Sequence, residues 1–503
     1  MTALPGLRVL NRRAVPLADV PMLPVDRFAR RIEDAIADAW RIVMLFGAPE
    51  TSDELRMLCV LAHDARGELS ALGTSVRQDY AALSAECRQA ARFECEIAEQ
   101  CGARPIGHPR LRALRRHAAD HAPLSWGDAA TTLPAFAFTP IGGDEVHEVA
   151  VGPVHAGIIE PGHFRFQAHG EEILSLEVVL GYQHRGVERL LECLPRERAI
   201  YVAESIAGDS TIAHASAYCG AIEALARSHK SPRAQAIRGI ALELERLANH
   251  IGDLGALSGD VAFQPAAAYF GRMRGDCLNL LMSISGNRYG RGLIRPGGVG
   301  FDMDDEIARE VEQRVARLAG EFRGIADLFF GAASVQSRLE GVGAVSREQC
   351  LAHGFVGIVA RACDVSRDVR RDHPYGVYRF AQIPVATAWA GDAYARALVR
   401  RLETLRSLAF IAEQASALPR GEIRSACGNL APNEFVVALE EGWRGEVVHA
   451  VLTDAAGRIR RHKVIDPSFH NWPAIEVAMP GNQISDFPLS NKSFNLSYAG
   501  HDL

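Results

Sequence analysis

The sequence predicts a mixed α+β protein that is mainly α-helical. Three observations predict this fold class. The chain has 503 residues, enough for more than one core, its first part alternates helical and strand signals, and long amphipathic stretches follow residue 230. We expect a small α/β domain over 1–122, a linker over 123–148 and a large helical-bundle domain over 149–503, with β-hairpins at the periphery of the bundle.

The first domain is predicted from local periodicity. Residues 26–39 are amphipathic at helical spacing, and 42–46 and 57–62 are apolar runs of strand length. Residues 81–100 are rich in Ala, Glu and Arg, which favours a second helix. A basic stretch, 110–117, closes this domain ahead of the linker, which is predicted because Pro, Gly, Thr and Asp replace any periodic pattern there.

Two hairpins are predicted in the second domain. Residues 163–168 and 172–179 are extended segments on either side of a short polar turn. Residues 446–453 and 458–465 alternate around the turn sequence DAAGR near the end of the chain.

Helices are predicted between these hairpins. Ser231 followed by Pro232 is a strong helix start, because serine caps the first amide groups and proline suits the first helical position. Apolar residues then recur at helical spacing, at Ile237, Ile240, Leu244, Leu247 and Ile251. Residues 305–318 and 392–416 are further amphipathic helices.

Composition excludes some classes of protein. The chain carries 61 acidic and 55 basic residues, a net charge of −6, so there is no basic excess with which to bind nucleic acid. The sequence contains no apolar run of membrane-spanning length, and Pro and Arg interrupt the first 24 residues, unlike a secretory signal. We expect a cytoplasmic protein whose membrane attachment comes through partners.

The cysteines are scattered and never form Cys-x-x-Cys. This spacing disfavours a zinc site or an iron–sulfur cluster held by this chain alone and favours reduced, buried thiols. The ten positions are Cys59, Cys87, Cys95, Cys101, Cys193, Cys219, Cys277, Cys350, Cys363 and Cys427.

Residues 181–192, GYQHRGVERLLE, carry the first polar constellation. On a helix, His184 and Glu188 would share a face, as would Arg185 and Arg189. The spacing favours a solvated face with ion pairs over a face that handles electrons or protons.

Three other constellations are candidates. Six polar residues share the long helix after Ser231, where the apolar stripe favours an internal polar network over a surface face. A Gly/Pro-rich loop over 152–166 carries His155, Glu160 and His163, and such residues are more often structural than catalytic. Arginines at 288, 291 and 295 would bind an anionic group or form a basic surface loop. The six helix residues are Arg238, Glu243, Glu245, Arg246, Asn249 and His250.

These segments together resemble one family. GYQHRGVERLLE and RAQAIRGIALELERLANHIGDLG are similar to signatures of the complex I 49-kDa subunit and of the large subunit of hydrogenase-4 and formate-hydrogenlyase-type [NiFe]-hydrogenases. GPVHAGIIEPGHFRF resembles the hydrogenases and IRPGGV resembles complex I. VRRDHPYGVY, LPRGEI and IDPSFHNWPAI continue the match in order. The resemblance covers essentially all of the second domain.

The first domain has its own resemblance. FECEIAEQCGARPIGHPRLRALRRH is similar to the 30-kDa subunit of complex I, whose Gly-His-Pro-x-Leu-Arg pattern is kept at 107–112. This resemblance implies a 30-kDa-like module fused to the larger domain, an arrangement found in formate-hydrogenlyase-type enzymes.

The departures from the family concern its metal site. The hydrogenases hold nickel and iron with two Cys-x-x-Cys pairs, because this metal pair needs soft thiolates. Ala207 and Ser210 stand at the first pair, and Ser497 and Gly500 stand at the second. We therefore expect neither a nickel–iron site nor hydrogen activation. Gly208 falls where complex I has its quinone tyrosine, so that site is not reproduced residue for residue either.

The remaining family residues concern electron and proton transfer. Arg185 resembles the arginine near the last iron–sulfur cluster of the neighbouring small subunit, where a guanidinium would raise the cluster's potential. His184 and His163 would lie near that cluster or an acceptor pocket. Glu160 resembles a hydrogenase glutamate linked to proton transfer, and His250 lies on the charged helix of the proton-coupling route.

The function that follows from the resemblance is electron transfer within a membrane-associated complex related to NADH:quinone oxidoreductase and hydrogenase. The expected partners are a 20-kDa-like small iron–sulfur subunit and antiporter-like membrane subunits on the inner face of the cell membrane. We expect no cofactor bound by this chain alone, and quinone as a possible acceptor; NAD binding belongs to such complexes as well. The alternative is a non-catalytic structural subunit.

Overall fold

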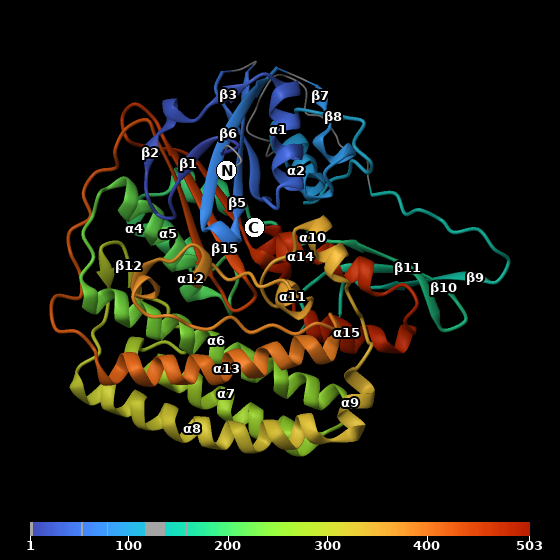
Figure 1. Ribbon diagram of the computed structural model, residues 1–503, viewed down its shortest axis with the longest axis vertical. Coiled ribbons are helices and arrows are strands. Elements are labelled where there is room, and N and C mark those ends of the chain that lie inside the picture. The colour runs from blue at the N-terminus through green and yellow to red at the C-terminus, as the bar shows by residue number, and fades with distance from the viewer. Residues whose placement is uncertain (1–3, 52–53, 78, 116–135, 156–158) are drawn as a thin grey trace.

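The structure is a computed structural model that describes residues 4–51, 54–77, 79–115, 136–155 and 159–503. Long helices are stacked at one end of the molecule, sheets lie at the centre and at the opposite end, and a three-stranded arm projects sideways (Figure 1). The predicted class, mixed α+β and mainly α, is confirmed. None of the described helices is long and apolar enough to cross a bilayer.

The N-terminal part is built on an antiparallel sheet of β4 (Arg41–Pro49), β5 (Leu55–His63) and β6 (Glu68–Val76). β1 (Leu7–Val9) and β3 (Met22–Leu23) pair with β6. The two strands and the first helix predicted here are confirmed. The helix is α1, Val25–Ala37.

The second predicted helix is shorter than expected. Residues 81–100 were expected to be helical throughout, but α2 covers only Ala91–Cys101. The buried carboxylate of Glu94 accepts hydrogen bonds from the amides of Leu83 and Ser84, at 2.8 and 3.0 Å. A side chain thereby holds this segment in short turns, and helix propensity alone does not reveal that competition.

Four long helices form the bundle: α6 (Pro232–Asp260), α7 (Gln264–Ser285), α8 (Asp305–Gly331) and α13 (Ala393–Ser416). α6 packs on α7 and α13, and α13 packs on α8 (Figure 1). The predicted cap of α6 is confirmed, since the side chain of Ser231 accepts from an amide of the first turn at 3.1 Å. Aspartates cap α8 and α13 in the same way.

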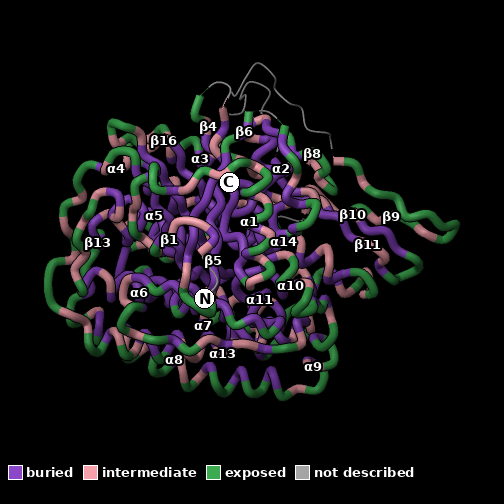
Figure 2. The backbone as a smooth tube through the Cα atoms, turned by 45° about the horizontal axis from the view of Figure 1, so that its top comes forward, coloured by how far each residue is buried: buried purple, intermediate pink, exposed green. Residues whose placement is uncertain are grey.

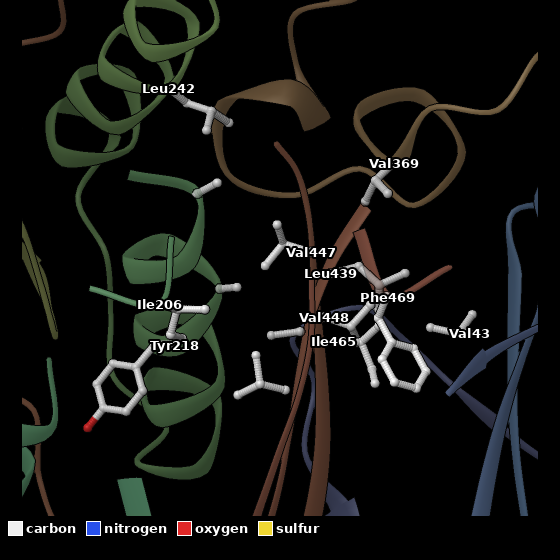
Figure 3. Packing of buried hydrophobic residues seen from close by; sticks show 14 of the residues in the cluster. Val43, Ile206, Tyr218, Leu242, Val369, Leu439, Val447, Val448, Ile465 and Phe469 are labelled. Atoms are coloured by element: carbon white, nitrogen blue, oxygen red, sulfur yellow. The ribbon is translucent and has the colours of Figure 1, made fainter. Parts of the chain in front are cut away.

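The second predicted hairpin is formed but is not peripheral. β15 (Glu446–Thr453) pairs with β16 (Ile459–Ile465) and with β14 (Glu434–Glu441), and every residue of β14 and β15 is buried. α5 (Thr211–Leu225) covers one face, and the N-terminal sheet lies beyond the other (Figure 3). Alternation predicts a half-exposed hairpin, but the N-terminal part covers the face that would otherwise be solvated.

The N-terminal part and the rest of the chain share this central sheet. β2 (Val15–Pro16) pairs with β14 and completes the order β16-β15-β14-β2. Arg41 of β4 donates to both carboxylate oxygens of Glu446, at 2.7 and 2.6 Å. One continuous hydrophobic core includes residues of both parts (Figure 2).

The first predicted hairpin is confirmed as β10 (His163–His169) and β11 (Glu172–Val179). β9 (Val146–Val151) adds a third strand, so the arm begins inside the predicted linker. Residues 123–135 of that linker and 116–117 of the basic stretch lie outside the described residues. The remaining elements are β7 (Tyr80–Ala81), β8 (Pro105–Ile106), α3 (Val187–Cys193), α4 (Arg196–Ala203), β12 (Ile294–Arg295), β13 (Gly298–Val299), α9 (Ala333–Leu339), α10 (Arg347–His353), α11 (Gly357–Ala362), α12 (Val369–Asp372), α14 (Pro467–Ala478), α15 (Phe487–Phe494) and α16 (Tyr498–Asp502), with 3₁₀ turns at Leu17–Asp19, Asp64–Arg66, Leu83–Ala85, Arg88–Ala90, Gly376–Arg379 and Ile484–Asp486.

Lys463 provides a test of how the two parts are held together. Its buried ammonium lies 2.6 Å from a carboxylate oxygen of Glu96 in α2 and 2.7 Å from one of Glu188 in α3. Replacing Lys463 with Met leaves these buried carboxylates without that cation, so we expect a loss of about 3–5 kcal/mol in the free energy of unfolding. Denaturant unfolding measures this loss.

The matched control is Arg458→Ala, which removes an exposed ion pair to Asp454 on the turn of the same hairpin. It should cost less than about 1 kcal/mol. Equal effects of the two substitutions would contradict the structural role assigned to Lys463.

Candidate functional site

Two loops that are distant in the sequence meet beside the start of α5. One is 205–210, and the other is 495–502, which contains α16. Arg185 joins them, because its guanidinium donates to the carbonyl oxygens of Ser205, Ile206 and Ala499 at 2.7, 2.8 and 3.1 Å. The four positions at which the family resemblance leads us to expect cysteine ligands are therefore gathered in one place. We call these two loops the loop junction.

A second arginine crosses the same junction. Arg444, at the tip of the β14–β15 hairpin, donates to both carboxylate oxygens of Asp209 at 2.6 and 2.7 Å and to the carbonyl of Asn495 at 2.6 Å. Its guanidinium stacks 3.9 Å from the ring of Trp443, whose indole donates to the carbonyl of Asp209. A bidentate pair between the buried Arg444 and the half-buried Asp209 thus lies among the positions where cysteine is expected.

The four replacing residues make only structural contacts. Ala207 is buried. Ser210 donates to its neighbour Asp209 at 3.4 Å, and Ser497 caps α16 by accepting from the amide of Gly500 at 2.9 Å. None of these groups offers a thiolate, so the chemistry of the donors does not fit a nickel–iron pair.

Gly500 has a steric reason to be glycine. A Cβ at this position would lie 2.6 Å from the carboxyl carbon of Asp466, well inside van der Waals contact. Asp466 cannot easily move, because it accepts from the His214 ring at 3.0 Å and from the Ser468 amide at 2.8 Å. A cysteine at 500 would require this buried carboxylate to be displaced. In the part of the chain that the structure describes, no three His, Cys, Asp or Glu side chains converge on a metal-sized site.

Glu160 lies at the loop junction. One of its carboxylate oxygens accepts from the amide of Tyr498 at 3.3 Å. Burial raises the pKa of Glu160, and the nearby Asp209 adds to this, while Arg444 opposes it. The sequence-predicted proton-transfer glutamate is therefore next to Arg444 and the loop that carries Ser497.

The two candidate histidines are placed differently. His184 bonds through Nδ1 to the carbonyl of Asp502 at 2.8 Å, so it lies beside Arg185 against the loop junction. His163 bonds through Nδ1 to the carbonyl of Gly152 at 3.2 Å, and its ring faces Phe138. His163 thus sits at the base of the arm.

The helix expected over 181–192 begins only at Val187, so the predicted one-turn spacing of His184 and Glu188 is wrong. Gly181 and Gly186 have φ of 93° and 68°, which breaks the helix before that point. The favoured solvated face fits Arg185 and Arg189, which are exposed, but is wrong for Glu188. Glu188 is buried and pairs with Arg461 and Lys463, which hold the pKa of its carboxyl well below the usual range despite burial.

The internal polar network predicted on α6 is confirmed, and it reaches the loop junction. Asn249 donates to the carbonyl of Asp209 at 2.9 Å. Glu245 accepts from the amides of Ile212 and Ala213, at 2.6 and 3.2 Å, at the start of α5. Burial raises the pKa of Glu245 to about 8, which makes it a carboxyl group that changes charge near neutral pH.

The network continues along α6 through Glu243. Its carboxylate binds Arg246 at 3.0 Å, Arg370 at 3.0 Å and the hydroxyl of Tyr378 at 2.7 Å. His250, one turn away from Arg246, bonds to Glu403 at 2.9 Å, and burial lowers the pKa of this histidine. The sequence-predicted His250 is therefore part of a buried chain of charges.

At its far end the network meets a cavity of about 530 Å³. Tyr378, Arg238, Lys230 and Arg12 are among the lining residues. Arg238 pairs with Glu223 through two bonds of 3.1 and 2.6 Å. Polar side chains thus extend along α6 from the loop junction to this cavity.

The three arginines of the predicted cluster have different surroundings in the structure. Arg295 pairs with Glu204 at 2.6 Å, whereas Arg288 and Arg291 are exposed. The surface-loop interpretation fits these two, and Arg295 has a structural partner.

Four residues of the site were not singled out from the sequence: Asp209, Glu245 as a titrating group, Arg444 and Asp466. Arg444 lies in the turn sequence GWRGE, and only the hairpin geometry directs it at Asp209. In the sequence, Asp209 and the dipeptide Trp443–Arg444 are simply polar or aromatic residues in two separate loops. Nothing in their local sequence reveals that these two loops meet.

Comparison with known proteins identifies the family. The family profile described as "Respiratory-chain NADH dehydrogenase, 49 Kd subunit" matches residues 260–434. The carbon monoxide-induced hydrogenase of Rhodospirillum rubrum is 30% identical over 344 residues, which is 68% of this chain and 95% of that protein. Formate hydrogenlyase subunit 5 of Escherichia coli is 27% identical over 443 residues, 85% of this chain and 77% of that protein.

A relative from the complex I side is about as similar. It belongs to the NADH-quinone oxidoreductase of Clostridium beijerinckii and is 29% identical over 337 residues, 67% of this chain and 91% of that protein. The chain belongs to the family that unites complex I 49-kDa subunits with the large subunits of hydrogenase-4 and formate-hydrogenlyase-type hydrogenases. Fusion to a 30-kDa-like module stays a prediction.

Glu245 leads to a pH-dependent prediction. Its pKa is higher in the folded protein, about 8, than in the unfolded chain, so the folded state holds the extra proton between these two values. Its contribution to stability is therefore full below the unfolded pKa and is lost as pH rises to about 8. Glu245→Gln should flatten this decline by up to about 1.4 kcal/mol per pH unit.

Thermal unfolding of the protein and of Glu245→Gln between pH 5 and 9 measures this difference. Glu422→Gln, at a carboxyl on the surface, is the control and should leave the slope unchanged. Identical slopes for all three proteins would show that Glu245 titrates at its ordinary value.

Proposed function

We propose that this chain is the electron-transfer subunit of a membrane-associated complex related to NADH:quinone oxidoreductase and hydrogenase, without hydrogen-activating chemistry of its own. The observation that carries the proposal is Arg185. It is an exposed residue whose guanidinium ties together the two loops of the junction. A partner's iron–sulfur cluster docked on this face would meet a fixed positive charge, which stabilises the reduced state of the cluster.

Proton coupling forms the second part of the proposal. Glu160 and Glu245 both have raised pKa values. Glu160 binds the Tyr498 amide of the loop junction, and Glu245 binds the first amides of α5, directly after the loop 205–210. The buried polar chain through Glu243 extends from there toward the cavity beside Tyr378. Arrival of an electron at the junction would favour uptake of a proton on these carboxyl groups, because added negative charge raises their pKa further.

The partners follow from the same proposal. A small iron–sulfur subunit would lie against Arg185 and His184, and antiporter-like membrane subunits would hold the assembly at the inner face of the membrane. Quinone is the proposed acceptor, within the complex rather than in this chain alone. NAD binding is proposed for the complex as a whole.

A structural role is the second candidate, and two contacts favour it. The Arg444–Asp209 pair lies among the missing ligands, and Gly500 packs directly against Asp466. Such packing fits a subunit that binds partner subunits but carries out no redox chemistry itself. The experiment on Arg185 separates the two candidates.

Arg185→Ala in the purified complex is the test. Removing one unit charge about 10 Å from a cluster, in an effective dielectric of about 20, lowers its midpoint potential by tens of millivolts. Redox titration followed by electron paramagnetic resonance measures this shift, and Arg185→Lys should retain most of the potential. Arg189→Ala, at an exposed arginine four residues further along the chain, is the control.

An unchanged cluster signal and unchanged turnover in Arg185→Ala, in a complex that still assembles, would favour the structural role.

Metal analysis is an independent test. The loop junction offers no thiolate, so the purified complex should carry far less than one nickel per copy of this chain. Plasma mass spectrometry measures the ratio, with iron as the internal reference for the partner's clusters. Stoichiometric nickel that is lost on Asp466→Asn substitution would overturn the assignment.

A further inference from the structure

Three buried histidines form a continuous row of hydrogen bonds in the centre of the protein, and the last of them binds a carboxylate. His214 of α5 bonds through Nε2 to Asp466 at 3.0 Å. Its Nδ1 lies 3.3 Å from Nε2 of His449 in β15, and Nδ1 of His449 lies 3.0 Å from Nε2 of His462 in β16. All four side chains are fully buried. Pairing of β15 with β16 places two of these rings on neighbouring strands, beneath α5.

For three neutral rings, only one arrangement of protons satisfies every contact in this row. With each imidazole neutral and protonated on Nε2, His462 donates to His449, His449 donates to His214, and His214 donates to Asp466. The opposite arrangement would leave the Asp466 carboxylate facing a bare nitrogen lone pair. Nδ1 of His462 then remains as the single ring nitrogen of the row that makes no hydrogen bond to the described residues.

The row is not built as a metal site. His449 uses one nitrogen toward His214 and the other toward His462, so the ring nitrogens do not point at a common centre. Metal ligation requires several donors around one point at about 2.0–2.1 Å. A linear series of donor–acceptor pairs is instead the arrangement that passes a proton from group to group.

We propose that His462, His449 and His214 form a proton relay that delivers a proton to Asp466 at the loop junction. The proton comes from solvent water that reaches Nδ1 of His462, a buried atom with no hydrogen-bond partner among the described residues. Its binding there releases the Nε2 proton to Nδ1 of His449. The Nε2 proton of His449 passes to Nδ1 of His214, and the Nε2 proton of His214 passes to the Asp466 carboxylate. One proton enters, one arrives, and each ring changes from the Nε2–H to the Nδ1–H tautomer.

The electrostatic surroundings of His462 and His449 favour their neutral forms. Burial lowers the pKa of His462 to about 3, and Arg461 adds to this while Glu188 opposes it. Burial also holds the pKa of His449 well below its usual range, with His462, His214 and Arg12 adding to the effect and Glu188 opposing it. The resting rings must be neutral, because an imidazolium has a proton on both ring nitrogens and cannot accept another proton from its neighbour.

The two ends of the relay have distinct surroundings. At the delivery end, Asp466 packs against Gly500, and the positive charge of Arg444 lies nearby. At the uptake end, the ring of Tyr218 stacks on His462 with an angle of 3° between the planes, and the His462 amide donates to Glu192 at 3.0 Å. The relay rests on the proposed function, since it supplies the proton that accompanies electron arrival at the junction.

The tautomers give a test that needs no activity. In the full-length protein with nitrogen-15 in its histidine rings, long-range proton–nitrogen spectra should show His214, His449 and His462 as neutral Nε2–H tautomers. Nitrogen–nitrogen couplings should appear across the two histidine–histidine hydrogen bonds. An Nδ1–H tautomer or an imidazolium at His449 in the resting protein would overturn the proposal.

Turnover of the complete complex gives the second test. His449→Gln keeps a hydrogen-bonding side chain but cannot exchange tautomers, so proton-coupled turnover should fall on the order of 10²-fold and its solvent isotope effect should change. His470→Gln is the matched control. His470 is another buried histidine; its ring nitrogen Nε2 bonds to the backbone carbonyl of Val43 at 3.2 Å, and its ring packs against Phe93. Loss of the same size in both variants would contradict the relay, as would unchanged turnover in His449→Gln.

Failure of the relay and failure of the proposed function give different results. If only the relay is wrong, Arg185→Ala still shifts the potential of the cluster, while His449→Gln turns over normally. If the electron-transfer role is wrong, Arg185→Ala has no effect on the cluster. His462→Phe, which removes the uptake nitrogen but leaves the contacts of His214 and Asp466, provides a second relay variant should His449→Gln fail to fold.

Discussion

Burial of the central sheet on both faces is the constraint on which the rest of the structure depends. α5 covers one face and the N-terminal sheet lies beyond the other, so every polar side chain on β14, β15 and β16 needs a partner inside the protein. Arg461 forms an ion pair with Glu188, and Lys463 forms one with Glu96. The same requirement accounts for the row of histidines, since each neutral ring satisfies the next.

The loop junction is held together by two guanidinium groups. Arg185 and Arg444 bridge its two loops through carbonyl and carboxylate oxygens. Two guanidinium groups supply many directed hydrogen bonds, so the loops remain joined without a metal ion. The junction consequently keeps a positive charge and acidic neighbours with shifted pKa values, which are the properties that electron and proton transfer use.

Much of the helical part could be predicted because its signals are local. Ser231 and Pro232 predict the start of α6, and the apolar stripe predicts which side is buried. The extent of α2 and the start of α3 could not be predicted in this way. Glu94 and the glycines at 181 and 186 act through contacts and backbone conformations that periodicity does not contain.

The sequence by itself determined the family and the main helices, because these depend on residue identity and short-range spacing. Only the tertiary structure decided that the last hairpin is buried, that Arg444 meets Asp209, and that His214, His449 and His462 line up on Asp466. The physical reason is that these contacts join segments separated by up to about half of the chain. Their geometry arises only when the sheet is covered on both sides and its polar groups must pair with one another.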